Sequence, residues 1–470
     1  MRHQGSAAPA TEGRFRAAGI VDDESRDTAA DDLARASSAE RTAKLVTLVA
    51  RPRGFDHVDG ELCAEGTPLT AIAARFGTPC YVYSRALLTH AFREFDAAFD
   101  GVPHLVCYAM KANPSLAIVD LFASLGSGFD IVSGGELARV QAAGGDPRKV
   151  VFSGVGKTDA EMEAALAAGI LCFNVESPSE LDHLSAIAAR MGRRAPVSLR
   201  VNPDVDPRTH PYIATGLRES KFGVSFGDAP ALYRRAASLA AIDVGGIDMH
   251  IGSQITELEP YREAAAKMLS LVDALAADGI ALSHVDFGGG LGTRYRDETP
   301  VSIADYAAMV RGLMHGRRER LLFEPGRRLV ADAGVLLTRV RLLKSAGARN
   351  FAVVDAAMND LLRPALYGAW HGVDAVAPRG GTAVCYDIVG PVCESGDFLA
   401  HERMLDLAEG DLLAVRSAGA YAMAMSSNYN ARPRACEVLV DGDAVNLIRR
   451  RETIAELVAQ ESRLPPQRAH

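Results

Sequence analysis

The sequence predicts an α/β protein with two domains, a parallel (β/α)8 TIM barrel followed by a mostly antiparallel β-sandwich or barrel. Two observations support this prediction. Between residues 81 and 326, short apolar runs alternate with Ala-rich amphipathic stretches, which is typical of repeated βα units. After residue 326, runs rich in Val and Leu and broken by Gly and Pro replace this alternation, as expected for antiparallel strands.

Eight strand candidates lie in the alternating segment, and eight units favour a closed barrel over an open doubly wound sheet. The candidates are residues 104–110, 128–132, 150–153, 171–175, 197–201, 246–250, 284–287 and 320–323. The strands expected in the β domain are residues 335–343, 351–355, 382–390, 411–415 and 435–440.

The length of 470 residues exceeds that of one ordinary domain. Residues 1–43 have almost no periodic apolar pattern, so we expect a disordered extension there, and the tail at 461–470 reads the same way. We expect residues 44–80 to pair with the β domain. The barrel is then assigned to residues 81–326 and the β domain to residues 327–460.

Composition excludes several classes of function. Charged residues make up 23% of the chain and the net charge is -8, so nucleic acid is not an expected partner. No apolar run approaches the roughly 20 residues of a membrane span, and the N-terminus lacks the apolar core of a signal peptide. The seven cysteines are odd in number and form no C-x-x-C pair. We therefore expect a cytoplasmic protein without a metal site.

Polar residues follow the barrel strands at the end where barrel enzymes carry their chemistry. Lys111 follows the first strand, and His250 and Ser253 follow the sixth. A glycine cluster at 288–292 follows the seventh strand, and Glu-Pro-Gly-Arg at 324–327 follows the eighth. Each signal is weak alone, but together they predict an active site at the barrel mouth.

Lysines are mostly solvated, but Lys111 at the mouth of an apolar strand would be partly desolvated. Desolvation would lower its pKa and suit it to covalent attachment of an aldehyde cofactor. Gly289 and Gly290 would let backbone N–H groups approach a phosphate, and Ser253 could add a hydroxyl donor. His250 is either a core histidine or a flat ring that stacks on the cofactor.

Glu324 gives the strongest indication of the reaction. A carboxylate beside a pyridine nitrogen keeps that nitrogen protonated and makes the ring an electron sink, which decarboxylation needs. A purely structural Glu324 would instead pair with Arg327 or Arg328.

The β domain adds a cysteine in a polar Gly/Pro loop at 390–397, where a thiol can act as a proton donor. This is Cys393, which we predict to be the general acid. Tyr421 lies further along the chain and is of a type that caps a phosphate.

From about residue 60 to residue 453, the chain resembles the alanine-racemase-like, fold type III decarboxylases that use pyridoxal 5'-phosphate (PLP), and among these the diaminopimelate decarboxylases. The motifs are Tyr-Ala-Met-Lys-Ala-Asn around Lys111, Phe-Ser-Gly-Val-Gly-Lys from Phe152, Arg-Val-Asn-Pro-Asp-Val from Arg200, His-Pro-Tyr-Ile-Ala-Thr-Gly-Leu from His210, Lys-Phe-Gly from Lys221, His-Ile-Gly-Ser-Gln from His250, Glu-Pro-Gly-Arg from Glu324, Arg-Pro-Ala-Leu-Tyr from Arg363 and Cys-Glu-Ser-Gly-Asp from Cys393.

The resemblance implies that PLP is carried on Lys111, with His250 over the ring and Glu324 at its nitrogen. Related racemases place an arginine at that nitrogen, so an acid there disfavours racemisation. The residues implied to hold the phosphate are Ser253, Gly289, Gly290, Gly326, Arg327 and Tyr421. The family also implies a homodimer with shared active sites, in which Cys393 and Glu394 come from the other chain.

The expected substrate is meso-2,6-diaminopimelate, which would give L-lysine and CO2. Its far end carries both a carboxylate and an ammonium. Arg327, Arg363 and Tyr367 are the predicted partners of the carboxylate, and Glu394 is the predicted partner of the ammonium. Tyr421 is a further predicted substrate-binding residue. Arg363 could instead be a surface residue. The sequence is also compatible with a relative that acts on carboxynorspermidine, arginine or ornithine, and with a non-catalytic homologue.

Overall fold

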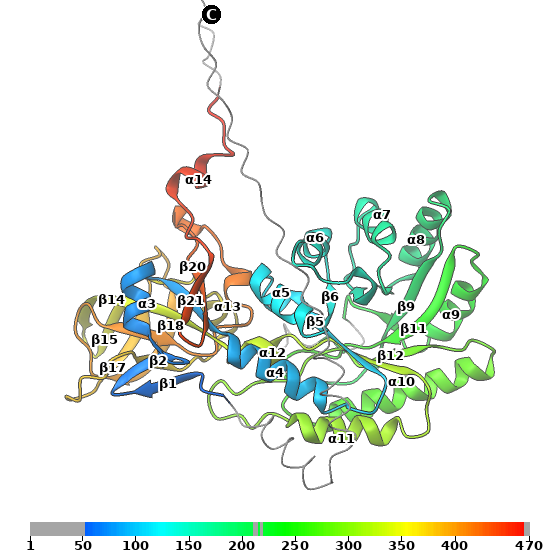
Figure 1. The fold of residues 1–470 in the computed structure, drawn as a ribbon, viewed down its shortest axis with the longest axis horizontal. Coiled ribbons are helices and arrows are strands. Elements are labelled where there is room, and N and C mark those ends of the chain that lie inside the picture. Colours follow the sequence, from blue (N-terminus) through cyan, green and yellow to red (C-terminus); the bar gives the residue numbers. More distant parts are fainter. Residues whose placement is uncertain (1–51, 210–214, 217–219, 465–470) are drawn as a thin grey trace, which may run out of the picture. The chain divides into compact units, whose positions relative to one another are not determined.

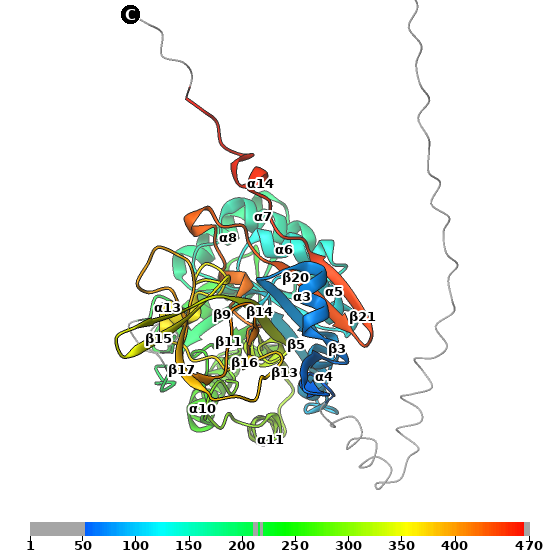
Figure 2. The same cartoon turned by 90° about the vertical axis from the view of Figure 1, so that its left-hand side faces the viewer.

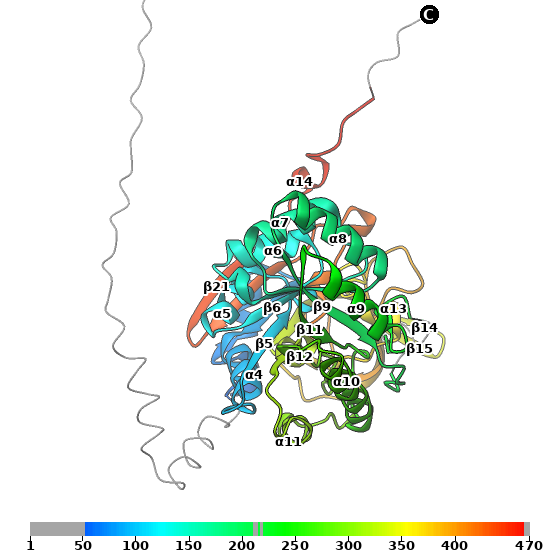
Figure 3. The same ribbon diagram turned by 90° about the vertical axis from the view of Figure 1, so that its right-hand side faces the viewer.

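The computed structural model describes residues 52–209, 215–216 and 220–464. All eight predicted barrel strands are present and parallel (Figures 1 and 3). They are β5 (His104–Ala109), β6 (Gly128–Ile131), β7 (Val150–Phe152), β8 (Cys172–Val175), β9 (Ala195–Asn202), β11 (Ile242–Asp248), β12 (His284–Asp286) and β13 (Arg320–Phe323). Their order is β9-β11-β12-β13-β5-β6-β7-β8, and a pairing of β8 with β9 closes the barrel.

Helices cover the outside of the barrel, as Figure 3 shows. They are α4 (Arg85–Ala97), α5 (Leu116–Ser124), α6 (Gly134–Ala142), α7 (Asp159–Ala168), α8 (Pro178–Arg190), α9 (Ala229–Ser238), α10 (Glu259–Ala277) and α11 (Ile303–Leu313). Several begin at a hydroxyl side chain that accepts a backbone N–H of the first turn, including Ser133, Thr158 and Ser302. These caps satisfy donors that the helix itself leaves unpaired.

Strand boundaries differ from the prediction mainly around β11, which begins at Ile242 rather than at residue 246. Its pairing with β9 shifts register between Val244 and Gly246. The shift breaks the apolar alternation there, which explains why only the second half of the strand could be predicted. A short additional strand, β10 (Val224–Ser225), pairs with β9.

The second domain is a sheet whose pairings are mostly antiparallel, as predicted (Figures 1 and 2). Its strands are β4 (Cys80–Ser84), β14 (Gly334–Ala346), β15 (Arg349–Val354), β16 (Val373–Ala375), β17 (Val384–Val389), β18 (Phe398–Leu405), β19 (Leu412–Val415), β20 (Cys436–Asp441) and β21 (Ala444–Arg449). The pairings of β15 with β17 and of β20 with β4 are parallel.

Strand β4 lies between β14 and β20 in this sheet, whereas the sequence pattern assigns nearly all of it to the barrel segment. All five of its residues are buried. A strand buried on both faces has no alternation, so its sequence does not distinguish a barrel strand from a central strand of another sheet.

The segment before β4 forms its own three-stranded sheet from β1 (Phe55–Val58), β2 (Glu61–Ala64) and β3 (Thr67–Pro68), followed by α3 (Leu69–Phe76). The Leu62 N–H donates to the Val376 carbonyl at 2.7 Å, so the segment contacts the β domain without extending its large sheet. The extension at 1–43 and the end of the tail lie outside the described residues. No helix among the described residues is long and apolar enough to cross a membrane.

Hydrogen bonds between the loop after β19 and the turn after β5 help to attach the β domain to the barrel mouth. The Tyr421 N–H donates to the Ala112 carbonyl at 2.8 Å, and Asn113 Nδ2 donates to the Gly419 carbonyl at 3.1 Å. The loop after β19 therefore lies against the turn that carries Lys111.

Candidate active site

Lys111 lies in the turn after β5, and its Nζ is 2.7 Å from Asp130 Oδ2. Asp130 is buried at the end of β6. Burial alone would lower the pKa of Lys111, but the negative charges of Asp130 and Glu324 outweigh it, and the pKa is raised above its ordinary value. The predicted lowering of this pKa is therefore wrong for the cofactor-free chain. Lys111 is therefore held as an ammonium, paired with the Asp130 carboxylate.

Three further acids are buried in the barrel, Asp248, Asp286 and Glu324, and their oxygens lie within 4.8 Å of one another. With Asp130 they form what we call the acid pocket. Both carboxylate oxygens of Asp248 and one of Asp286 have no hydrogen-bond partner among the described residues. Burial and the charges of neighbouring acids raise the pKa of all three carboxyl groups, that of Asp248 to about 7 although the charge of Arg200 opposes the shift. The pocket is suited to a ligand with a cationic group.

The same spacing of carboxylate oxygens could also suit a metal ion. The absence of a metal site, expected from the sequence, stays a prediction.

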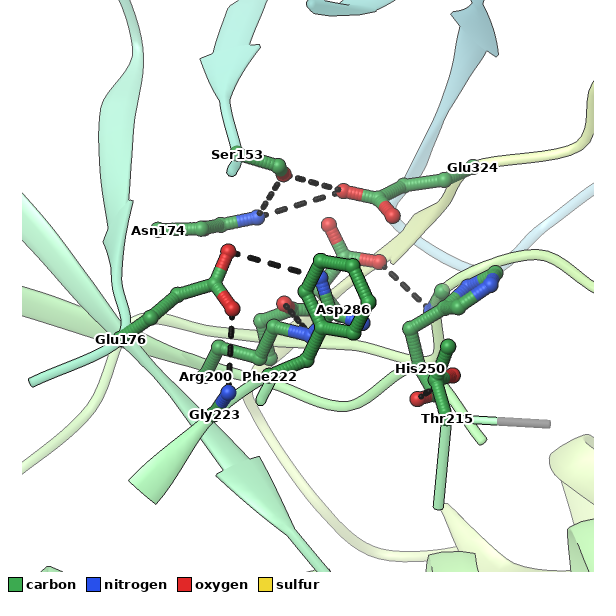
Figure 4. Close-up of polar contacts among 12 residues, drawn as sticks. Ser153, Asn174, Glu176, Arg200, Thr215, Phe222, Gly223, His250, Asp286 and Glu324 are labelled. Atoms are coloured by element: carbon green, nitrogen blue, oxygen red, sulfur yellow. Dashed lines mark hydrogen bonds and ion pairs between the residues drawn. The ribbon is translucent and has the colours of Figure 1, made fainter. Parts of the chain in front are cut away.

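Glu324 follows β13, and its Oε1 accepts hydrogen bonds from Asn174 Nδ2 at 3.2 Å and Ser153 Oγ at 3.5 Å (Figure 4). Among the described residues it pairs with neither Arg327 nor Arg328, so the pairing expected of a purely structural Glu324 is absent, and its role at the ring nitrogen stays a prediction. Arg327 bonds to other groups, described below, and Arg328 lies 4.0 Å from Glu94. Among the described residues, Lys111 is a cation whose charge lowers the pKa of Glu324 and so opposes the effect of burial.

His250 follows β11, and its Nδ1 lies 3.3 Å from the Gly289 N–H, which donates to it (Figure 4). Burial, together with the charges of Arg200 and Lys111, lowers the pKa of His250 well below its ordinary value. The imidazole is therefore neutral, with its proton on Nε2. Whether it stacks on a cofactor ring stays a prediction.

Arg200 is a buried residue of the barrel interior that sequence reasoning did not single out as a site residue. Its Nη1 lies 3.5 Å from Glu176 Oε1, and its guanidinium lies 4.9 Å from the centre of the Phe222 ring (Figure 4). Glu176 also accepts the N–H groups of Gly154 and Gly223. This network fixes the loop after β9 against the ends of β7 and β8.

The glycine turn after β12 cannot carry side chains. A Cβ at Gly289 would stand 2.2 Å from the Glu324 carbonyl oxygen, and one at Gly288 would stand 2.2 Å from the Met249 carbonyl oxygen. Gly290 has φ +99°, which L side chains rarely adopt. No side chain therefore covers the backbone of this turn, which suits close approach of a phosphate, but the N–H groups of Gly288 and Gly289 already donate to Asp286 Oδ1 and His250 Nδ1.

Arg327 begins α12 (Arg327–Val330) and is buried. Its Nη1 donates to the Tyr295 hydroxyl at 2.7 Å and its Nη2 to Ser253 Oγ at 2.9 Å. The guanidinium also lies 4.7 Å from the centre of the Tyr421 ring. The structure therefore brings together three of the residues predicted for the phosphate or the substrate.

Arg363 begins α13 (Arg363–Tyr367) and is buried, so the interpretation of Arg363 as a surface residue is wrong. Its guanidinium lies 4.3 Å from the Tyr295 ring centre, and Nη1 lies 2.8 Å from His371 Nε2. Tyr367 interacts electrostatically with both arginines. Arg327 and Arg363, which we call the arginine pair, each have an Nε without a hydrogen-bond partner and make no ion pair among the described residues.

His371 accepts the hydrogen bond from Arg363 because it is neutral. Burial and the charge of Arg363 lower its pKa to about 3. Its Nδ1 lies 2.8 Å from the Arg416 carbonyl, so the proton is on Nδ1 and Nε2 accepts. Sequence reasoning missed both His371 and Tyr295, because nothing in the neighbouring residues indicates a contact with Arg363.

The comparisons with known proteins agree with this geometry. The family described as "Pyridoxal-dependent decarboxylase, pyridoxal binding domain" matches residues 85–331. The diaminopimelate decarboxylase of Pseudomonas aeruginosa is 60% identical over 411 residues, which cover 87% of this chain and 99% of that protein. This chain belongs to the diaminopimelate decarboxylase family.

Solved structures of this family have the same fold. Diaminopimelate decarboxylase from Helicobacter pylori, complexed with L-lysine, superimposes with a TM-score of 0.81 at 41% identity, covering 84% of this chain and 99% of that one. The enzyme from M. jannaschii in co-complex with L-lysine gives a TM-score of 0.84 at 37% identity, covering 88% and 98%. The resemblance found in the sequence is confirmed.

Cys393 and Glu394 are exposed in the loop between β17 and β18. The Cys393 N–H donates to Asn430 Oδ1 at 3.0 Å, and Glu394 Oε1 accepts from the Tyr429 hydroxyl at 2.7 Å. These contacts lie within the β domain, so the structure of one chain does not bring either residue to Lys111. Their roles in this diaminopimelate decarboxylase family member stay predictions.

Proposed function

We propose that this chain decarboxylates meso-2,6-diaminopimelate to L-lysine and CO2, a step of lysine biosynthesis, with PLP as cofactor. The observation that carries the proposal is the arginine pair. Two buried guanidinium groups without a carboxylate partner among the described residues require an anion from a ligand, because uncompensated buried charge is costly. The two solved relatives with bound L-lysine support this reading.

The residues present fit the cofactor. When bound, PLP supplies an electron sink that stabilises the electron pair left by departing CO2. Lys111 is placed to hold it covalently once the ammonium has lost a proton, and Asp130 orients its Nζ. Glu324 is the acid for the ring nitrogen, and the oxygens of Asp248 and Asp286 that lack hydrogen-bond partners favour positive charge in the same pocket, although Asp248 also lies 3.9 Å from Arg200 Nε. The bare glycine turn, Ser253 and the Gly326–Arg327 backbone are suited to the phosphate.

The substrate then spans the two charged regions. One end reacts near Lys111, and the carboxylate of the other end reaches the arginine pair, which can bind it in two-point fashion. Tyr367 and Tyr421 line the same region, and Glu394 takes the distal ammonium. The carbon that loses CO2 must receive a proton, and the Cys393 thiol is the proposed donor.

The test is Arg363→Ala. Losing a charge-assisted hydrogen bond to a buried carboxylate should lower kcat/KM for diaminopimelate by about 10- to 100-fold. Activity on ornithine or lysine as substrates should fall far less, because neither has a second carboxylate. Arg434→Ala, which removes an arginine paired with Glu452 in the same domain, is the matched control and should leave the ratio of substrates unchanged.

Equal losses on all three substrates, or a wild-type enzyme that prefers ornithine, would reject diaminopimelate and leave a related basic substrate. A wild-type chain that binds no PLP would favour a non-catalytic homologue. The buried pairing of Lys111 with Asp130 speaks against that second outcome.

The proposal includes a homodimer in the cytoplasm with shared active sites. The exposed position of Cys393 and Glu394, away from Lys111 of their own chain, supports a partner barrel as their target. All seven cysteines are free thiols, which suits a reducing compartment.

Mixing inactive Lys111→Ala and Cys393→Ala chains should restore about a quarter of the wild-type activity, because half of the dimers are hybrids with one intact site of two. Cys385→Ala removes the other exposed cysteine and should stay active by itself. No recovery after demonstrated subunit exchange would refute the shared site.

A further inference from the structure

Asn174 is a fully buried amide at the end of β8, with 0% of its surface exposed. Its Nδ2 donates to Glu324 Oε1 at 3.2 Å and to Ser153 Oγ at 3.0 Å (Figure 4). Its Oδ1 accepts from Cys172 Sγ at 3.7 Å on the other side. The reversed amide would place an oxygen against the carboxylate, so these contacts fix the donor side toward Glu324.

Glu324 needs such a donor because its surroundings favour the protonated form. Burial and the charges of Asp130, Asp286 and Asp248 all raise its pKa, and the charge of Lys111 opposes them. A hydrogen bond donated to a carboxylate stabilises the ionised form. Among the described residues, the two donors to this carboxylate, Asn174 and Ser153, bind Oε1 and leave Oε2 for a ligand.

We propose that Asn174 is a positioning residue that holds Oε1 of Glu324, directs its Oε2 to the cofactor ring nitrogen and favours a carboxylate there in the holoenzyme. The inference rests on the cofactor assignment of the proposed function. A protonated Glu324 is a neutral and weaker acceptor for the N–H of a pyridinium, so the ring would lose its proton more easily and become a weaker electron sink. Asn174 therefore acts on the reaction through Glu324 without touching the substrate.

The experiment uses the holoenzyme with PLP labelled with 15N at the ring nitrogen, without substrate. In Asn174→Leu, which keeps the volume but removes the donor, the 15N signal should move from the protonated toward the unprotonated position. The affinity of the apoprotein for PLP should fall about tenfold. Ser153→Ala, which removes the longer contact, should cause a smaller change in the same direction.

Cys172→Ala is the matched control, because it removes the contact on the oxygen side of the same amide and leaves both donors in place. Its 15N signal should stay at the wild-type position. If Asn174→Leu does not fold, Asn174→Ser, which is too short to reach Glu324, takes its place.

A second ligand distinguishes an effect on the ring nitrogen from a general loss of structure in the binding site. An analogue of PLP with carbon in place of the ring nitrogen should bind equally well to the wild type and to Asn174→Leu. An unchanged 15N signal in the variant, or an equal loss of affinity for both ligands, would overturn the inference. A wild-type protein that fails to bind PLP would instead overturn the proposed function.

Discussion

The acid pocket and the arginine pair are both buried, but they carry their charge in different ways. Carboxyl groups can take up protons, and the raised pKa values of Asp248, Asp286 and Glu324 reduce the negative charge of the acid pocket without any ligand. Guanidinium groups keep their charge at every pH that proteins tolerate. Protonation can therefore reduce the charge of the acid pocket, whereas the charge of the arginine pair must be balanced by an anion.

Lys111→Ala should have the largest effect on activity, because Lys111 is the cation that pairs with Asp130 in the acid pocket. The variant should lose its covalent, borohydride-reducible link to PLP, and its activity should fall by about three orders of magnitude or more. Lys149→Ala, at a half-buried lysine that bonds to the Gly126 carbonyl, should keep the link. A reducible adduct that persists on Lys111→Ala would refute the assignment.

The barrel and its motif residues could be predicted because both are local properties of the sequence. Strand periodicity and the residues that follow each strand are read within a few positions, which located Lys111, Glu324 and the glycine turn. Strand β4 could not be placed, because its partners β14 and β20 lie more than 200 residues away and its burial on both faces hides which sheet it joins.

Several site residues could not be predicted because their roles depend on contacts between distant segments. Asp130, Asn174 and His371 are ordinary residues in their own segments, and only contacts across the fold give them a role. The pKa of Lys111 was predicted with the wrong sign because burial was considered without Asp130, which comes from the next strand of the barrel.

Asp248→Asn tests whether protonation of the acid pocket affects the stability of the folded chain. The pKa of Asp248 is raised from 3.8 to about 7 in the folded chain. The favourable contribution of Asp248 to the free energy of unfolding is therefore present below pH 4 and is lost as the pH rises through 7. At pH 8 the variant should be more stable than the wild type by up to about 4 kcal/mol.

Urea unfolding at pH 4 and pH 8 measures this difference, which should vanish at the lower pH. Bound PLP should reduce the gain, because a cationic ring partly pairs with the acids. Asp297→Asn, at an exposed acid, is the control. A gain that is equal at both pH values would contradict the titration of Asp248.

His371→Gln tests the arginine side, where the expected effect is smallest. The pKa of His371 is lowered from 6.5 to about 3, so the unfolded chain binds a proton below pH 6.5 that the folded chain does not. The wild type should therefore lose about 2 kcal/mol of folding stability through this residue between pH 6.5 and pH 5.

Glutamine cannot titrate, but its amide can accept from Arg363 and donate to the Arg416 carbonyl, as the neutral histidine does. The stability of the variant relative to the wild type should then improve by about 2 kcal/mol from pH 8 to pH 5, while the exposed His315→Gln control should show no such trend. A relative stability that does not change with pH would mean that His371 takes up a proton beside Arg363, and the arginine pair would then include a third cation at acidic pH.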